Sequence, residues 1–165
     1  NSRIHAEISI FHCMDIGSNN SYPSCALSNF EPYDFTVSGV ECKSMEGFLQ
    51  SLKVKDQKEQ EKICQLTGFA AKVVGLQHND WKIKQKRYWR GFEYPRQSIE
   101  YQLLLDKAYM ELFKNERFRK ALEDTGDEVL THSIGNTNPR DTVLTIDEFC
   151  TRLMALRNRL KKRKN

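Results

Sequence analysis

A carboxylate, an amide and an amine recur at helical spacing in the first third of the chain. Glu46, Gln50 and Lys53 lie at positions i, i+4 and i+7, so at about 100° per residue they form one row along a helix. Such a row is usually a solvated face with weak contacts between its members. At the edge of a cleft, burial would instead move the pKa values of the acid and the amine toward neutrality. Spacing alone leaves both interpretations open.

The element that must position this row is a short helix predicted at residues 44–53. Ser44 is a suitable N-cap, and the carboxylate of Glu46 in the first turn suits the positive end of the helix. An apolar stripe at helical spacing runs beside the polar row and is predicted to face the core. The stripe consists of Met45, Phe48, Leu49 and Leu52.

The remaining patterns predict an α+β fold, a mostly helical single domain with a few short strands. A β-hairpin is expected at residues 35–42 with its turn at Ser38-Gly39. A basic segment from Trp81 is expected to form a helix whose aromatic side chains pack inward, although it could instead stack a base or track phosphate. Strands are also expected at 6–14 and 129–133, and helices at 56–66, 69–76, 98–114 and 116–123, with a last helix that starts at a capping box, 145–148.

The longest predicted helix, residues 98–114, is expected to turn its apolar side chains toward the core. Ile99 and Leu103 are included in that inner side, together with Leu104, Ala108, Tyr109 and Leu112.

The composition fits one domain. With 165 residues, of which 39% are hydrophobic, the chain can bury one real core, and residues 1–165 are expected to form a single domain with a basic tail at 161–165. Much of the net charge of +4 lies in that tail, so charge is weak evidence for a nucleic-acid partner. No apolar run is long enough to cross a bilayer and no signal-peptide pattern is present. We therefore expect no membrane partner, and a monomer.

The cysteines and histidines show no pattern typical of a metal site. The 5 cysteines are scattered, their number is odd, and no pair has CxxC or Cys/His zinc spacing. This usage favours free thiols in a reducing compartment, cytoplasmic or nuclear. No metal and no cofactor is expected.

Short motifs follow one another in an order typical of a known family. The succession resembles the NADAR family, also called YbiA-like, across nearly the whole chain. It comprises Leu27-Ser28-Asn29-Phe30, Phe35-Thr36-Val37 with Gly39, Ser44-x-Glu46-x-x-x-Gln50-x-x-Lys53, Ala71-Lys72, Asp80-Trp81, Leu122-x-x-Thr125-Gly126, Pro139-x-Asp141 and Leu153-Met154-x-x-Arg157.

The resemblance implies a small α+β domain that binds ADP-ribose-like or ribosylamino compounds and hydrolyses an N-glycosidic bond. Members remove ADP-ribose from guanine in nucleic acid, or cleave ribosylamino intermediates of riboflavin synthesis. The implied partners are an ADP-ribose-containing ligand and ADP-ribosylated DNA or RNA. By motif match, the implied catalytic residues are Glu46 and Lys53, and the implied substrate-binding residues are Asn29, Phe30, Gln50, Trp81 and Asp141.

The chain departs from the family pattern at several positions, which indicates a divergent branch. Gly47 replaces the usual His after the motif Glu, Leu144-Thr145 replaces a Trp-Gly pair, and His132 replaces the usual Glu after a strand. We expect His132 to be a packed or exposed histidine and not a catalyst. The departures motivate an alternative function, a non-catalytic module that senses ADP-ribose or NAD.

Two mechanisms are compatible with the row. Cleavage of a ribosyl C1–N bond passes through an oxocarbenium-like state. Glu46 could stabilise the positive charge of that state, or it could deprotonate a water molecule that attacks it. Lys53 could act as an acid, or its neutral amine could form a Schiff base with the ribose, which requires a pKa lowered by burial. The sequence does not choose between them.

Overall fold

The computed structural model describes residues 12–164, so most of the strand expected at 6–14 lies outside the described residues. The helices are α2 (Ser24–Leu27), α3 (Met45–Ser51), α4 (Gln57–Cys64), α5 (Gly68–Leu76), α6 (Trp81–Lys84), α7 (Ile99–Leu112), α8 (Glu116–Glu123) and α9 (Ile146–Lys164). The strands are β1 (Cys13–Asp15), β2 (Phe35–Val37), β3 (Val40–Cys42), β4 (Lys86–Trp89), β5 (Phe92–Pro95) and β6 (Val129–Thr131). The predicted α+β fold, a mostly helical single domain with a few short strands, is confirmed.

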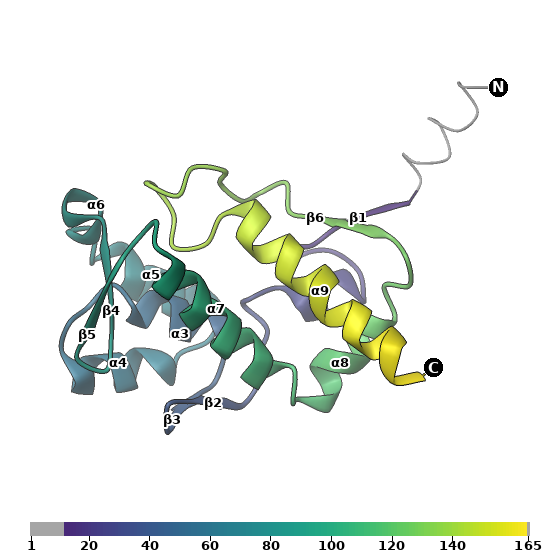
Figure 1. Ribbon diagram of the computed structural model, residues 1–165, viewed down its shortest axis with the longest axis horizontal. Helices are drawn as coiled ribbons and strands as arrows, with labels where there is room; N and C mark the ends of the chain where they lie inside the picture. The colour runs from purple at the N-terminus through teal and green to yellow at the C-terminus, as the bar shows by residue number, and fades with distance from the viewer. Residues whose placement is uncertain (1–11, 165) are drawn as a thin grey trace.

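Helix α7 runs through the middle of the molecule (Figure 1). Helices α3, α4 and α5 and the hairpin β4–β5 gather on one side of it, and α8, α9 and the pair β1–β6 lie on the other. The strands form two antiparallel hairpins, β2–β3 and β4–β5, and one parallel pair in which β1 and β6 join segments far apart in the chain. Within residues 12–164, no helix combines the length and the apolar character needed to span a bilayer.

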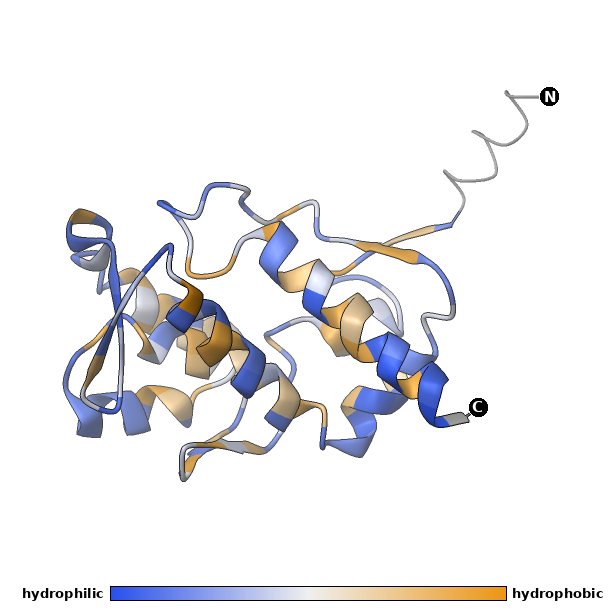
Figure 2. Ribbon diagram, viewed as in Figure 1, coloured by the Kyte–Doolittle hydropathy of each residue, from blue (hydrophilic) through white to orange (hydrophobic). Residues whose placement is uncertain are grey.

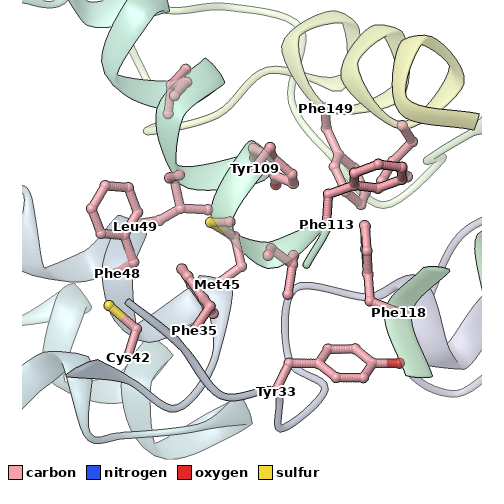
Figure 3. Close-up of a cluster of buried hydrophobic side chains, with 14 of the residues drawn as sticks. Tyr33, Phe35, Cys42, Met45, Phe48, Leu49, Tyr109, Phe113, Phe118 and Phe149 are labelled. Atoms are coloured by element: carbon pink, nitrogen blue, oxygen red, sulfur yellow. The ribbon is translucent and has the colours of Figure 1, made fainter. Parts of the chain in front are cut away.

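The core joins α7 to α3, α8 and α9 and combines aliphatic with aromatic side chains (Figure 3). Phe48 on α3 meets Trp89 edge to face at 5.0 Å between ring centroids, and Tyr33 meets Phe118 on α8 at 5.9 Å. Such pairs contribute roughly 0.5–1.5 kcal/mol each beyond the area they bury. The outer face of α8 and the C-terminal end of α9 are polar, and the predicted basic tail continues α9 as far as Lys164 (Figure 2).

Helix α3 has the cap and the faces that its sequence predicts. The Ser44 hydroxyl accepts the Gly47 N–H at 3.0 Å and donates to the Leu66 carbonyl at 2.9 Å, which fixes the helix start against the end of α4. The whole apolar stripe of α3 is buried.

The helix predicted from Trp81 through Trp89 is wrong beyond its first turn. Gln85 has a left-handed backbone, with φ of 53°, and ends α6 after Lys84. The chain then turns back as a hairpin at Arg90-Gly91, where φ is 51° and 89°. Two consecutive positive φ angles are typical of the tight turn that matches strand twist, so residues 86–95 pair as strands.

The inner face predicted for α7 is also wrong at Ile99 and Leu103. These side chains are 77% and 61% exposed, because neither position belongs to the buried stripe of the helix. That stripe recurs at i, i+3, i+4, i+7, i+8 and i+11, and consists of Tyr101, Leu104, Leu105, Ala108, Tyr109 and Leu112.

We expect Gly47→Ala to destabilise the protein by about 1–3 kcal/mol, because overpacking a buried site costs about that much. A Cβ at Gly47 would lie 2.7 Å from the Leu66 carbonyl oxygen and 2.9 Å from that of Ile63, and backbone cannot move aside cheaply. Urea unfolding tests the sign: a helix-interior alanine normally stabilises relative to glycine by about 1 kcal/mol, so a more stable variant would contradict the packing argument.

Candidate active site

A cavity of about 640 Å³ opens between α3 and α5 on one side and the segments that follow β1 and β6 on the other. The loop before β2, the loop before α9 and Phe149 at the start of α9 complete its walls. Polar side chains from separate parts of the chain converge there, as is common in ligand sites. They are Ser18, Asn19, Ser28, Asn29, Glu46, Gln50, Lys72, His132, Asn136, Asp141 and Thr142.

Glu46 is held in the cavity wall by its backbone and by its side chain. Its N–H donates to the Asn29 carbonyl at 2.9 Å, and Gln50 Nε2 donates to its Oε1 at 2.7 Å. Burial raises the pKa of Glu46, while the Gln50 hydrogen bond and the charge of Lys53 oppose that rise. Its second carboxylate oxygen has no hydrogen-bond partner within residues 12–164. The side chain is therefore a carboxylate with one fixed oxygen and one oxygen available to a ligand.

Gln50 on α3 packs against Gly75 of α5. A Cβ at Gly75 would lie 1.9 Å from Gln50 Oε1, so only glycine lets α5 pack here. Gln50 is 7% exposed, and its Oε1 has no partner among the described residues. Its amide is thus fixed in the orientation that donates to Glu46.

Lys53 lies in the lining of a second, smaller cavity of about 350 Å³, and not in that of the larger one. Its Nζ donates to the Gly75 carbonyl at 3.1 Å. Burial, and then the charge of Arg87, lowers the pKa of Lys53 to about 8, although the charge of Glu46 acts in the opposite direction. The charges of Lys53 and Glu46 therefore interact electrostatically, but the two residues line different cavities.

Three of the other predicted binding residues lie in the larger cavity. Asn29 Oδ1 accepts the Tyr109 hydroxyl at 2.8 Å, and burial raises the pKa of that tyrosine well above its usual value. Phe30 forms part of the wall beside Asn29. Asp141 comes from the loop before α9, where its carboxylate accepts the Asn138 amide at 3.0 Å. The cavity therefore combines a fixed amide, an aromatic face and a second carboxylate with Glu46.

Trp81 is buried and lines the smaller cavity with Lys53. The Arg87 guanidinium stacks on its ring at 4.4 Å from the centroid. The structure therefore brings Glu46 and Gln50 together with Asn29, Phe30 and Asp141 in the larger cavity. It places Trp81 and Lys53 in the smaller one.

Sequence reasoning assigned no role to His132, Lys72 or Asn136, which the structure brings into the larger cavity. The signal that could have found His132 is its place directly after a strand. Strands β1 and β6 are parallel, so the chain leaves both at the same edge, and ligand sites form at the carboxyl ends of parallel strands.

No group of three or more His, Cys, Asp or Glu side chains within residues 12–164 is arranged to hold a metal ion. The chemistry available in the cavity is that of two carboxyl groups, an imidazole, amides, hydroxyl groups and a lysine.

The fold is that of the E. coli protein YbiA, whose NMR structure matches with a TM-score of 0.59 at 19% identity, over 92% of this chain and 86% of that chain. The YbiA-like fold expected from the order of motifs is thereby confirmed. A model of the family described as bacteriophage protein GP30.3 matches residues 21–158, and the chain belongs to that family. A relative from Enterobacteria phage T4, described as an uncharacterized 17.1 kDa protein in the Gp30-rIII intergenic region, is 38% identical over 149 residues, covering 89% of this chain and 98% of that protein.

Proposed function

We propose that the protein is an N-glycosidase of the NADAR type, which hydrolyses the bond between the ribose C1 of an ADP-ribosyl group and a base nitrogen. Guanine in nucleic acid is the leading candidate for the base. The observation that carries the proposal is Glu46, a carboxylate in a cavity of about 640 Å³ with one oxygen held by Gln50 and the other unpartnered within residues 12–164. The YbiA fold supports the same assignment.

The chemistry is hydrolysis through an oxocarbenium-like state. A water oxygen bonds to C1 as the C1–N bond breaks, and the electron pair of that bond goes to the base nitrogen. Glu46 accepts a proton from the water and stabilises the positive charge that develops on the sugar. The departing nitrogen takes up a proton. Gln50 holds the carboxylate in place throughout, since its amide is fixed by α5.

The cavity supplies features that suit an ADP-ribosyl group. Its volume lies within the range of about 300–1,000 Å³ that is usual for small-molecule sites. Phe30 and Leu76 offer apolar surface to a base, and the Lys72 side chain offers a positive charge to the diphosphate. Lys82 and Lys84 on α6 are exposed and could meet phosphates of a nucleic-acid strand, in keeping with a DNA or RNA partner in the cytoplasm or nucleus.

The test is a DNA oligonucleotide with one ADP-ribosylated guanine. We expect the protein to release ADP-ribose and restore unmodified guanine, both measured by chromatography and mass spectrometry. Glu46→Gln should lower the rate of release at least about 100-fold, whereas Glu41→Gln, at an exposed glutamate on β3, should not change it. No release by the wild-type protein at any pH contradicts the proposal.

Two further arms of that experiment separate the alternative functions. In the first arm, a ribosylaminopyrimidine replaces the oligonucleotide. If the protein hydrolyses this smaller substrate and releases no ADP-ribose from the oligonucleotide, the cavity is assigned to the ribosylaminopyrimidine. Calorimetry with ADP-ribose detects a binding module: tight binding without hydrolysis of either substrate would favour a sensor.

We expect no borohydride-trapped adduct on Lys53 during turnover. Its Nζ donates to the Gly75 carbonyl, and Lys53 lines the smaller cavity whereas Glu46 lines the larger one. A Schiff base needs the neutral amine, so a covalent route would accelerate as pH rises through about 8, the lowered pKa of Lys53. Peptide mass spectrometry after borohydride treatment checks this, and an adduct on Lys53 with such a pH profile would establish the covalent route instead.

A further inference from the structure

The imidazole of His132 is held in one orientation at the wall of the larger cavity. Its Nδ1 lies 2.7 Å from the Ile16 carbonyl oxygen, and its ring meets Phe149 edge to face at 5.1 Å between centroids. A Cβ at Gly135 would lie 2.7 Å from His132 Cδ2, so the glycine leaves just enough room for the ring. A carbonyl can only accept, so Nδ1 carries the proton and Nε2 is the other functional atom.

The Nε2 atom has no hydrogen-bond partner within residues 12–164, and His132 lines the cavity that contains Glu46. The two side chains come from different walls, His132 from the end of β6 and Glu46 from α3. Two contacts fix the ring, the hydrogen bond at Nδ1 and the edge-to-face packing on Phe149, while Nε2 has no partner among the described residues. Such an arrangement is typical of a residue positioned for proton transfer.

We propose that His132 is the catalytic acid of this site: its Nε2–H protonates the base nitrogen as the C1–N bond breaks. This inference rests on the N-glycosidase function proposed above. In the step, the imidazolium gives its Nε2 proton to the nitrogen, which has received the electron pair of the broken bond. The water oxygen bonds to C1 and its proton goes to Glu46. The products are the free base, ADP-ribose, neutral His132 and protonated Glu46, and solvent returns both groups to their starting forms.

The charged groups around His132 are suited to an imidazolium. Glu46 faces it from α3 and Asp15 from β1, and the positive charge of His132 lowers the pKa of Asp15 further, after the hydrogen bonds from Ser133. The positive charge of Lys72, on α5 at the rim of the cavity, acts against a positive charge on His132. The carboxyl group of Asp141 comes from the loop before α9. Histidine is the side chain that most often serves as a general acid or base in enzymes.

The decisive experiment follows kcat/KM against pH on the ADP-ribosylated oligonucleotide for wild type, His132→Gln and His132→Glu. His132→Gln should lower kcat/KM at least about 100-fold, the usual contribution of a catalytic acid, and should remove the alkaline limb of the profile. His132→Glu should restore part of the rate with the alkaline limb moved to lower pH. His78→Gln, a histidine of the smaller cavity, is the matched control and should behave as wild type.

Two measurements separate an acid from a structural residue. Calorimetric affinity for ADP-ribose should change less than about threefold in His132→Gln, since the ring would act on the leaving nitrogen and not on the product. In the wild-type protein, the NMR titration of the His132 ring should give the same pKa as the alkaline limb of kcat/KM, because that limb reports the acid of the free enzyme. This second measurement requires no variant to fold.

The outcomes distinguish the two proposals. Wild-type protein without activity at any pH removes the proposed function and this inference with it. Active wild type with an unchanged rate and an intact alkaline limb in His132→Gln overturns only the role of His132. Loss of the acidic limb in place of the alkaline one overturns it too, because His132 would then be the base.

Discussion

Glu46→Gln is expected to lower the release of ADP-ribose at least about 100-fold, because glutamine can neither accept a proton from water nor balance a positive charge on the sugar. The substitution keeps the shape of the side chain and can still accept the Gln50 amide hydrogen bond. Affinity for ADP-ribose should therefore be nearly unchanged. Rates and calorimetry on the same preparations check this, with Glu41→Gln as the control. Equal loss of rate and affinity would point to a distorted cavity instead of a lost carboxylate.

The same substitution is expected to stabilise the fold at pH 7. Burial raises the pKa of Glu46, so the folded protein binds this proton more tightly than the unfolded chain does. Glu46 therefore favours folding most at low pH. That contribution is lost as the pH rises from the pKa of glutamate in the unfolded chain, about 4.3, through the raised pKa of Glu46 in the folded protein. Glutamine removes the cost of the buried charge, so the gain in urea midpoint should be present at pH 7 and absent at pH 4.

Glu148→Gln is expected to destabilise the protein by about 3–5 kcal/mol, because it removes one partner of a buried ion pair. Arg96 is 1% exposed, and its guanidinium donates to both Glu148 oxygens, at 2.7 and 3.1 Å. Without the carboxylate, the arginine charge stays buried and uncompensated. Urea unfolding measures the loss. Glu61→Gln breaks a more exposed pair with Arg90 and should cost less than about 1 kcal/mol.

The ion pair also sets the acid stability of the fold. Burial alone would raise the pKa of Glu148, but the hydrogen bonds from Arg96, the Thr145 N–H and Gln102 lower that pKa to about 2. The stabilising contribution of Glu148 is present above the pKa of glutamate in the unfolded chain, about 4.3, and it is lost as the pH falls to about 2. The stability of the wild type should therefore fall more steeply between those values than that of Glu148→Gln, and equal slopes would contradict the assignment.

Glu148 also affects the cavity through Arg96. Arg96 Nε donates to the Thr142 carbonyl at 2.9 Å, and the Tyr101 hydroxyl donates to the Val143 carbonyl at 2.6 Å. Thr142 and Val143 line the cavity. Glu148→Gln should therefore weaken ADP-ribose binding as well as stability, although it lies outside the cavity lining.

Local sequence signals predicted the elements that carry Glu46. The Ser44 cap, the apolar stripe of α3 and the capping box of Thr145 and Glu148 form as predicted, because each depends on residues within one or two helical turns. The hairpin β2–β3 also forms at its predicted turn. These elements placed Glu46 and Gln50 side by side before any tertiary contact was known.

Features that depend on unusual backbone angles or distant contacts were not predictable. The hairpin β4–β5 follows a positive φ at Gln85, a position that no glycine marks, and its turn pairs Gly91 with a positive φ at Arg90. The separation of Lys53 from the larger cavity depends on Gly75 of another helix. His132 reaches the cavity through contacts with a segment 116 residues earlier in the chain, which no local pattern specifies.

The parallel pairing of β1 with β6 has a consequence for protein synthesis. Residue 131 must leave the ribosome before β1 can find its partner, and α9 must follow before Phe149 packs on His132. Contacts between distant segments form slowly, since a long loop must close first. A nascent chain can build α3 to α5 early, but the larger cavity is completed only after Phe149 has been translated.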